Sequence, residues 1–78
     1  MTTVDARGLA CPLPLTMAKH RIAELRPGET LVVLATDPEA PIDLSAWAAR
    51  EGHGYEELAR DGYAEFRVTR AVPGKKLQ

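Results

Sequence analysis

VDARGLACPLPL (residues 4–15) is the stretch in which a predicted strand passes into a predicted helix. Cys11, the only cysteine among 78 residues, stands in it directly before Pro12. A residue that precedes proline is pushed out of the α region, which is the backbone geometry of a helix N-cap, and proline suits the first helical position. The stretch therefore predicts that Cys11 caps a helix that begins at Pro12.

This position favours a reactive sulfur. Pro14 has no N–H group, so the amide of Leu13 is the donor expected to face the cysteine, with the amide of Leu15 behind it. That donor and the positive end of the helix dipole favour a thiolate, and cysteines so placed can have a pKa well below the ~8.5 of a free thiol. The alternative is a buried, inert cysteine that serves as a small hydrophobic side chain. We predict an accessible Cys11 with a lowered pKa.

Apolar spacing and turn residues divide the rest of the chain. A helical pattern follows Pro12 and stops at Pro27-Gly28, and a nearly continuous apolar run over residues 31–35 predicts the central strand. Asp61-Gly62 between two alternating segments predicts a hairpin. The expected elements are, in order, a strand over residues 2–7, a helix over 12–25, a strand over 31–35, a helix from about 41 to 52, and strands over 55–60 and 63–70.

The order βαβαββ predicts a two-layer α/β sandwich. Right-handed crossovers place both helices on one face of a four-stranded mixed sheet. Cys11 then lies at the carboxyl end of the first strand, close to Asp37 after the second, at the edge where open α/β sheets usually place their sites. We expect one domain over residues 1–72 and a flexible tail over 73–78.

Composition narrows the classes of function. Ten basic and eleven acidic side chains, with interspersed signs, give a net charge of −1, which argues against nucleic-acid binding. A single cysteine excludes an intramolecular disulfide and favours a reducing compartment. No apolar run approaches the ~20 residues of a membrane span. We expect a cytoplasmic protein with no membrane contact.

The quoted stretch resembles the TusA (SirA-like) family of sulfur carriers, in which a C-P-x-P box follows the first strand. Two further segments are similar to the family: residues 25–31, LRPGETL, and residues 36–47, which contain Thr36-Asp37-Pro38, Asp43-Leu44 and Trp47. The resemblance runs from Val4 to about Val68. It implies a fold similar to the C-terminal domain of a bacterial translation initiation factor, with four mixed strands and two helices on one face.

The resemblance also implies a function. Cys11 would accept sulfane sulfur as a persulfide from a cysteine desulfurase or a rhodanese-type donor and relay it to an acceptor protein. Such a chain is a component of sulfur transfer rather than a stand-alone enzyme, and we expect a monomer without a cofactor or metal. Around the cysteine, the implied site residues are Gly8, Pro12, Leu13 and Pro14; for partner docking they are Lys19 and Asp37, to which Arg7 adds a basic side chain.

Two of these positions carry alternatives. Asp37 also fits a turn or Asx cap before Pro38. Leu13 occupies the variable position of the C-P-x-P box, where carriers that supply sulfur for tRNA thiolation resemble one another in having glutamate. This departure counts against tRNA thiolation and leaves molybdenum-cofactor synthesis, sulfur oxidation and other sulfur trafficking open.

Other functions fit the sequence less well. A thiol redox protein commonly uses a resolving cysteine, which this chain lacks, and an RNA- or protein-binding module rests on fold similarity alone. A metal site would need Cys11 to meet ligands such as Asp37, Asp43, His20 or His53, but the paired spacing of such sites is missing. We expect both histidines to be solvated and Trp47 to pack in the core beside Leu44.

Overall fold

The structure is a computed structural model that describes residues 2–72, so the expected tail over 73–78 lies outside the described residues. The chain follows the predicted βαβαββ order. The elements are β1 (Thr2–Ala6), α1 (Leu13–Ile22), β2 (Thr30–Ala35), α2 (Ala40–Glu51), β3 (Gly54–Ala59) and β4 (Ala64–Thr69).

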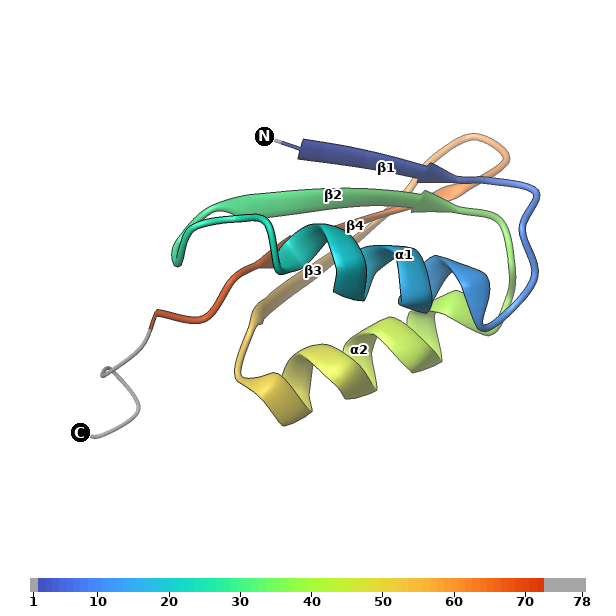
Figure 1. The fold of residues 1–78 in the computed structure, drawn as a ribbon. Coiled ribbons are helices and arrows are strands. Elements are labelled where there is room, and N and C mark those ends of the chain that lie inside the picture. Colours follow the sequence, from blue (N-terminus) through green and yellow to red (C-terminus); the bar gives the residue numbers. More distant parts are fainter. Residues whose placement is uncertain (1, 73–78) are drawn as a thin grey trace.

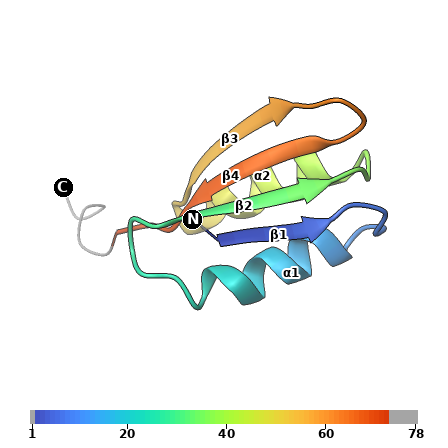
Figure 2. The ribbon, with the colours of Figure 1, turned by 90° about the horizontal axis from the view of Figure 1, so that it is seen from above.

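The four strands form one mixed sheet in the order β1-β2-β4-β3. β1 pairs with β2 in parallel, from Thr2 opposite Leu31 to Ala6 opposite Ala35, and β4 runs antiparallel to both β2 and β3. Figure 2 looks onto the sheet and shows β2 and β4 at its centre. The predicted central place of the apolar 31–35 run is confirmed.

Both helices lie on one face of the sheet, which confirms the two-layer architecture (Figure 1). Alternate side chains of β2 and β4 point toward them, and burying each large one stabilises the fold by roughly 1.5–3 kcal/mol. The largest fully buried side chains are Phe66, Leu31, Leu44, Val33, Val68 and Pro14.

The second helix buries Leu44, Trp47 and Ala48 against the sheet, as its spacing predicts. The rings of His53 and Trp47 pack in a T-shaped arrangement with 5.2 Å between their centroids, and His53 Nδ1 accepts a hydrogen bond of 2.9 Å from the amide of Ala71. Burial lowers the pKa of this imidazole. The expectation that His53 is solvated is therefore wrong, because its ring is half-buried between Trp47 and the amide of Ala71, just after β4.

The first helix ends earlier than its apolar pattern predicts. After Ile22 the chain continues in single turns, and the Arg70 guanidinium donates hydrogen bonds to the carbonyl oxygens of Ile22 and Ala23 at 3.1 and 3.2 Å, and to that of Leu25. Carbonyls at the end of a helix have no amide of the next helical turn to bind. Of these three, only that of Ile22 also accepts a hydrogen bond from a local amide, that of Leu25 at 3.1 Å. The arginine at the end of β4 thus ties the end of α1 to the sheet.

The face of the sheet away from the helices carries an ionic cluster. Glu65 pairs with Arg60 at 2.9 Å and with Arg67 at 2.8 Å, which holds the pKa of this carboxyl below its usual range. Val32 lies on the same face, next to Arg67 in the sheet register, and is nearly buried. Within residues 2–72, no helix has the length and apolar character needed to cross a bilayer.

Gly52 ends α2 in the left-handed region with φ of 77°, and its amide bonds back to Ala48 and Ala49. A Cβ here would meet no atom within 4 Å, so a substitution suffers from backbone strain alone. We expect Gly52→Ala to lower the free energy of unfolding by about 1 kcal/mol and Gly52→Asn to cost clearly less. Urea unfolding of both variants tests this; equal losses would contradict the backbone explanation.

Candidate functional site

Two loops meet at the edge of the sheet where β1 and β2 end. Parallel strands bring their carboxyl ends together, so the loop after β1 faces the loop after β2. The amide of Gly8 donates to Thr36 Oγ1 at 2.9 Å, and the amide of Cys11 donates to Asp37 Oδ2 at 2.8 Å. Gly8 itself turns the chain with φ of 81°. The cysteine backbone is therefore held by the second loop.

Asp37 uses its other carboxylate oxygen within its own loop. Oδ1 accepts a hydrogen bond of 2.7 Å from the amide of Glu39, which is the Asx turn that the sequence offers as one alternative. One half-buried carboxylate thus fixes the entry to α2 and the backbone of Cys11 together.

Cys11 is not the N-cap of α1, contrary to the sequence prediction. The helix begins at Leu13, and Pro12 occupies the N-cap position with φ of −99° and ψ of 21°. The Leu13 amide, expected to face the sulfur, donates instead to the Ala10 carbonyl at 2.9 Å. The Cys11–Pro12 peptide bond is cis. Pro14 lies in the first turn, as predicted, and its side chain is fully buried.

The sulfur points toward the second helix instead. Cys11 Sγ donates a hydrogen bond to Asp43 Oδ2 at 2.7 Å, from the first turn of α2. This hydrogen bond, partial desolvation and the negative charges of Asp43, Asp37 and Glu39 raise the pKa of the Cys11 thiol to about 11. The prediction of a lowered pKa is wrong, because a surface helix end shifts a pKa by less than about one unit and a bonded carboxylate outweighs it.

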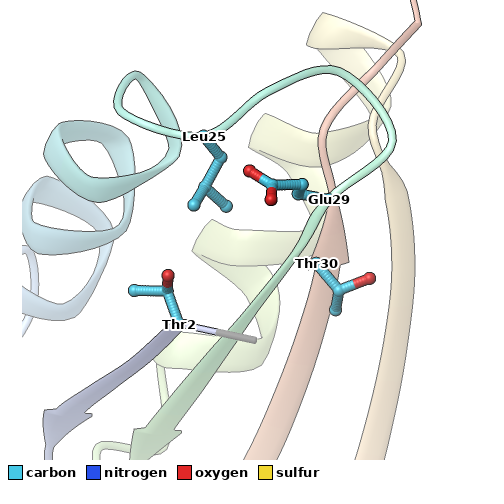
Figure 3. Close-up of a pocket in the computed structure, with 4 residues that line it drawn as sticks. All are labelled: Thr2, Leu25, Glu29 and Thr30. Atoms are coloured by element: carbon cyan, nitrogen blue, oxygen red, sulfur yellow. The ribbon is translucent and has the colours of Figure 1, made fainter.

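Accessibility of the thiol is confirmed, since Cys11 is free and exposed. Apolar side chains are also exposed at the starts of both helices: Leu13 is 47% exposed and Ile42 is 62% exposed. The thiol therefore lies at an open surface of the molecule. A hollow of about 260 Å³ lined by Thr2, Leu25, Glu29 and Thr30 lies at the opposite end of β1 and β2 (Figure 3).

Of the remaining site residues, Arg7 is paired with Asp5, Lys19 is exposed at the surface, and Asp43 contacts the sulfur. Arg7 is engaged: its guanidinium binds both carboxylate oxygens of Asp5 at 2.8 Å and lies 5.0 Å from the centroid of the Tyr63 ring. Lys19 is exposed on α1. Asp43, which the sequence suggests only as a possible metal ligand, contacts the sulfur directly. The sequence signal that could have identified this contact is an acidic residue in the first turn of a helix that starts at the same sheet edge as Cys11.

Metal binding finds no support among the described residues. Over residues 2–72, the structure forms no group of three or more His, Cys, Asp or Glu side chains arranged to hold an ion. The carboxylates near Cys11 instead bind its amide and its thiol.

Comparisons with known proteins agree on one family. The model of the family described as Sulfurtransferase TusA matches residues 2–70. The sulfur carrier protein TusA of Allochromatium vinosum is 39% identical over 59 residues, covering 76% of this chain and 78% of that protein. The Bacillus subtilis protein YrkI is 44% identical over 76% of this chain and 79% of its own length.

Two further relatives extend the comparison. YrkF of Bacillus subtilis is 48% identical over 59 residues, or 76% of this chain, but that match spans only 32% of YrkF, about a third of its length. The crystal structure of a SirA-like protein from Desulfitobacterium hafniense superposes with a TM-score of 0.84 at 32% identity, covering 92% of this chain and all of the other. The fold expected from the sequence is therefore confirmed.

The raised pKa predicts a slow thiol in the free protein. Thiolate is the reactive form, so the rate of alkylation by iodoacetamide should climb with pH and reach half its maximum near pH 11. The same measurement in denaturant should show a midpoint near the ~8.5 of a free thiol. A native midpoint at or below that of the unfolded chain would show that Asp43 does not control the sulfur.

Proposed function

The chain belongs to the TusA family of sulfur carriers, and we propose that it carries sulfane sulfur as a persulfide on Cys11. Family membership implies exchange of sulfur with donor and acceptor proteins. The proposal adds that Cys11 Sγ binds the transferred sulfur and that the bound form is a persulfide.

The observation that carries the proposal is the placement of Cys11. Its backbone is held by Asp37, while its side chain is exposed between the first turns of α1 and α2. A carrier must present its sulfur to the active site of another protein, and a fixed backbone with an exposed side chain meets that need. Gly8, Pro12, Leu13 and Pro14 shape this presentation.

The transfer step balances without an oxidant or a cofactor. The Cys11 sulfur, once deprotonated, attacks the outer sulfur of a donor persulfide, and a new S–S bond forms on Cys11. The S–S bond of the donor breaks, and its electron pair stays on the donor's inner sulfur, which takes up the proton that Cys11 lost. Delivery is the same exchange in reverse, with an acceptor thiol as the attacking group. Persulfidation is a reversible state of cysteine, as a carrier requires.

The proposed donor is a protein of the cysteine desulfurase or rhodanese type, and the carrier acts as a monomer. Lys19, exposed on α1, is the proposed docking cation, and Asp37 supports docking through the loop that it holds. Arg7, which lies over the Tyr63 ring of the β3–β4 hairpin, is a second proposed contact for a partner protein. Leu13 in the C-P-x-P box counts against tRNA thiolation, so the proposed acceptor pathways are molybdenum-cofactor synthesis, sulfur oxidation or other sulfur trafficking.

Loading should depend on the single sulfur atom of this chain. After incubation with a cysteine desulfurase and cysteine, the wild-type protein should gain about 32 Da, the mass of one sulfur. Cys11→Ser should gain nothing and keep the native circular dichroism spectrum, because the side chain is exposed. Mass spectrometry of the intact protein provides the measurement, and sulfur uptake by Cys11→Ser would refute the assignment.

Docking should respond to charge at Lys19 independently of the thiol. We expect Lys19→Glu to slow loading by a protein donor by roughly threefold to tenfold, because a reversed charge at an interface rim lowers the association rate. Arg50→Glu, in the last turn of α2 and away from Cys11, is the matched control and should load normally. Alkylation by iodoacetamide should be unchanged in both. Equal loading of the two variants would remove Lys19 from the docking surface.

A further inference from the structure

The contact between Cys11 and Asp43 is not required by the sulfur transfer itself. The two residues lie 32 positions apart, on the loop after β1 and in the first turn of α2, and only the packing of the two layers brings them together. Their atoms Sγ and Oδ2 are 2.7 Å apart. A carboxylate this close to the reacting sulfur changes what that sulfur can do.

In the empty carrier, the contact holds the sulfur as a thiol. An ionised carboxylate only accepts hydrogen bonds, so the bond exists only while Cys11 keeps its proton. Removing the proton would place two anions in direct contact, and this is why the pKa of the thiol is raised.

The charges around the sulfur reinforce this effect. Asp37 and Glu39 from the loop before α2 add negative charge. The first turn of α1 carries no charged side chain, and Arg7 on the loop after β1 is bound by Asp5. On the β3–β4 hairpin, Arg60 is paired with Glu65. Among the described residues, the groups that shift the thiol are thus carboxylates.

Loading reverses the relation between the two groups. A persulfidated Cys11 has no proton on Sγ, so it cannot donate to Asp43, and its outer sulfur lies about 2.05 Å further out. Persulfides also ionise more readily than thiols. The carboxylate that stabilises the empty thiol therefore repels the loaded group.

Building on the proposed function, we propose that Asp43 makes the reactivity of Cys11 depend on its load: it retains the empty thiol through a hydrogen bond that the persulfide cannot form. The empty carrier is then slow toward soluble electrophiles and oxidants. The loaded carrier is fast and presents its outer sulfur to solvent from the exposed Cys11 side chain.

The test compares three full-length proteins, the wild type, Asp43→Asn and Glu39→Gln, each empty and loaded by a cysteine desulfurase with cysteine. Glu39→Gln is the matched control, because it removes a nearby charge that forms no hydrogen bond with the sulfur. Intact mass verifies the load, about 32 Da, and iodoacetamide alkylation at pH 7 measures the reactivity of each state. Should Asp43→Asn fail to fold, Asp43→Ser replaces it.

We expect the empty Asp43→Asn thiol to react roughly 10- to 100-fold faster than the wild type at pH 7, as its pKa returns toward ~8.5. Its rate should reach half-maximum at lower pH, which a purely structural role would not cause. Glu39→Gln should change the rate less than about threefold, because an unbonded surface charge is screened by solvent. The loaded forms should react at similar rates, so that the ratio of loaded to empty reactivity collapses in Asp43→Asn alone.

Two outcomes separate this inference from the proposed function. Normal loading with equal empty-state rates and midpoints in the wild type and Asp43→Asn would overturn the role of Asp43 and leave the persulfide carrier intact. A wild type that gains no sulfur mass from a cysteine desulfurase with cysteine or from a rhodanese-type donor would overturn the carrier function and the dependence on load, whatever the thiol rates show.

Discussion

Parallel pairing of β1 with β2 is the constraint on which the site depends. It brings the carboxyl ends of the two strands to one edge, so the loop after each strand faces the other. The side chains of Thr36 and Asp37 then bind the amides of Gly8 and Cys11, and Asp37 also binds the start of α2. Because Asp37 holds the amide of Cys11 and Thr36 holds the preceding turn at Gly8, the sulfur can stay exposed without a pocket to position it.

The chemistry of Cys11 shows two electrostatic effects in competition. The starts of two helices favour an anion at the sulfur, whereas the carboxylates of Asp43, Asp37 and Glu39 oppose it. The carboxylates prevail, because a direct hydrogen bond to Asp43 acts at 2.7 Å, while a helix end at the surface is screened by water. A carrier gains from this balance, since a sulfur that waits between partners should not react with small molecules.

The packing between the two layers sets the position of the helices relative to the sheet. Large side chains such as Phe66 and Leu31 fill the space between sheet and helices, and small ones such as Ala18 and Ala48 let the helices lie close to the strands. That packing sets where α2 begins relative to the loop after β1. The position of one carboxylate at the sulfur is therefore a consequence of how the whole core is filled.

The sequence by itself determined the order of the elements, the central place of the 31–35 strand, the hairpin at Asp61-Gly62 and the location of Cys11 beside Asp37. These features follow from local backbone preferences and apolar periodicity, which neighbouring residues encode. Only the tertiary structure decided that α1 starts after Cys11, that His53 is covered, and that Asp43 holds the thiol. Each of these depends on contacts between distant segments, whose distance and direction arise when the helices pack on the sheet. The sequence places an acidic residue in the first turn of α2, but it does not fix the contact of that residue with the sulfur.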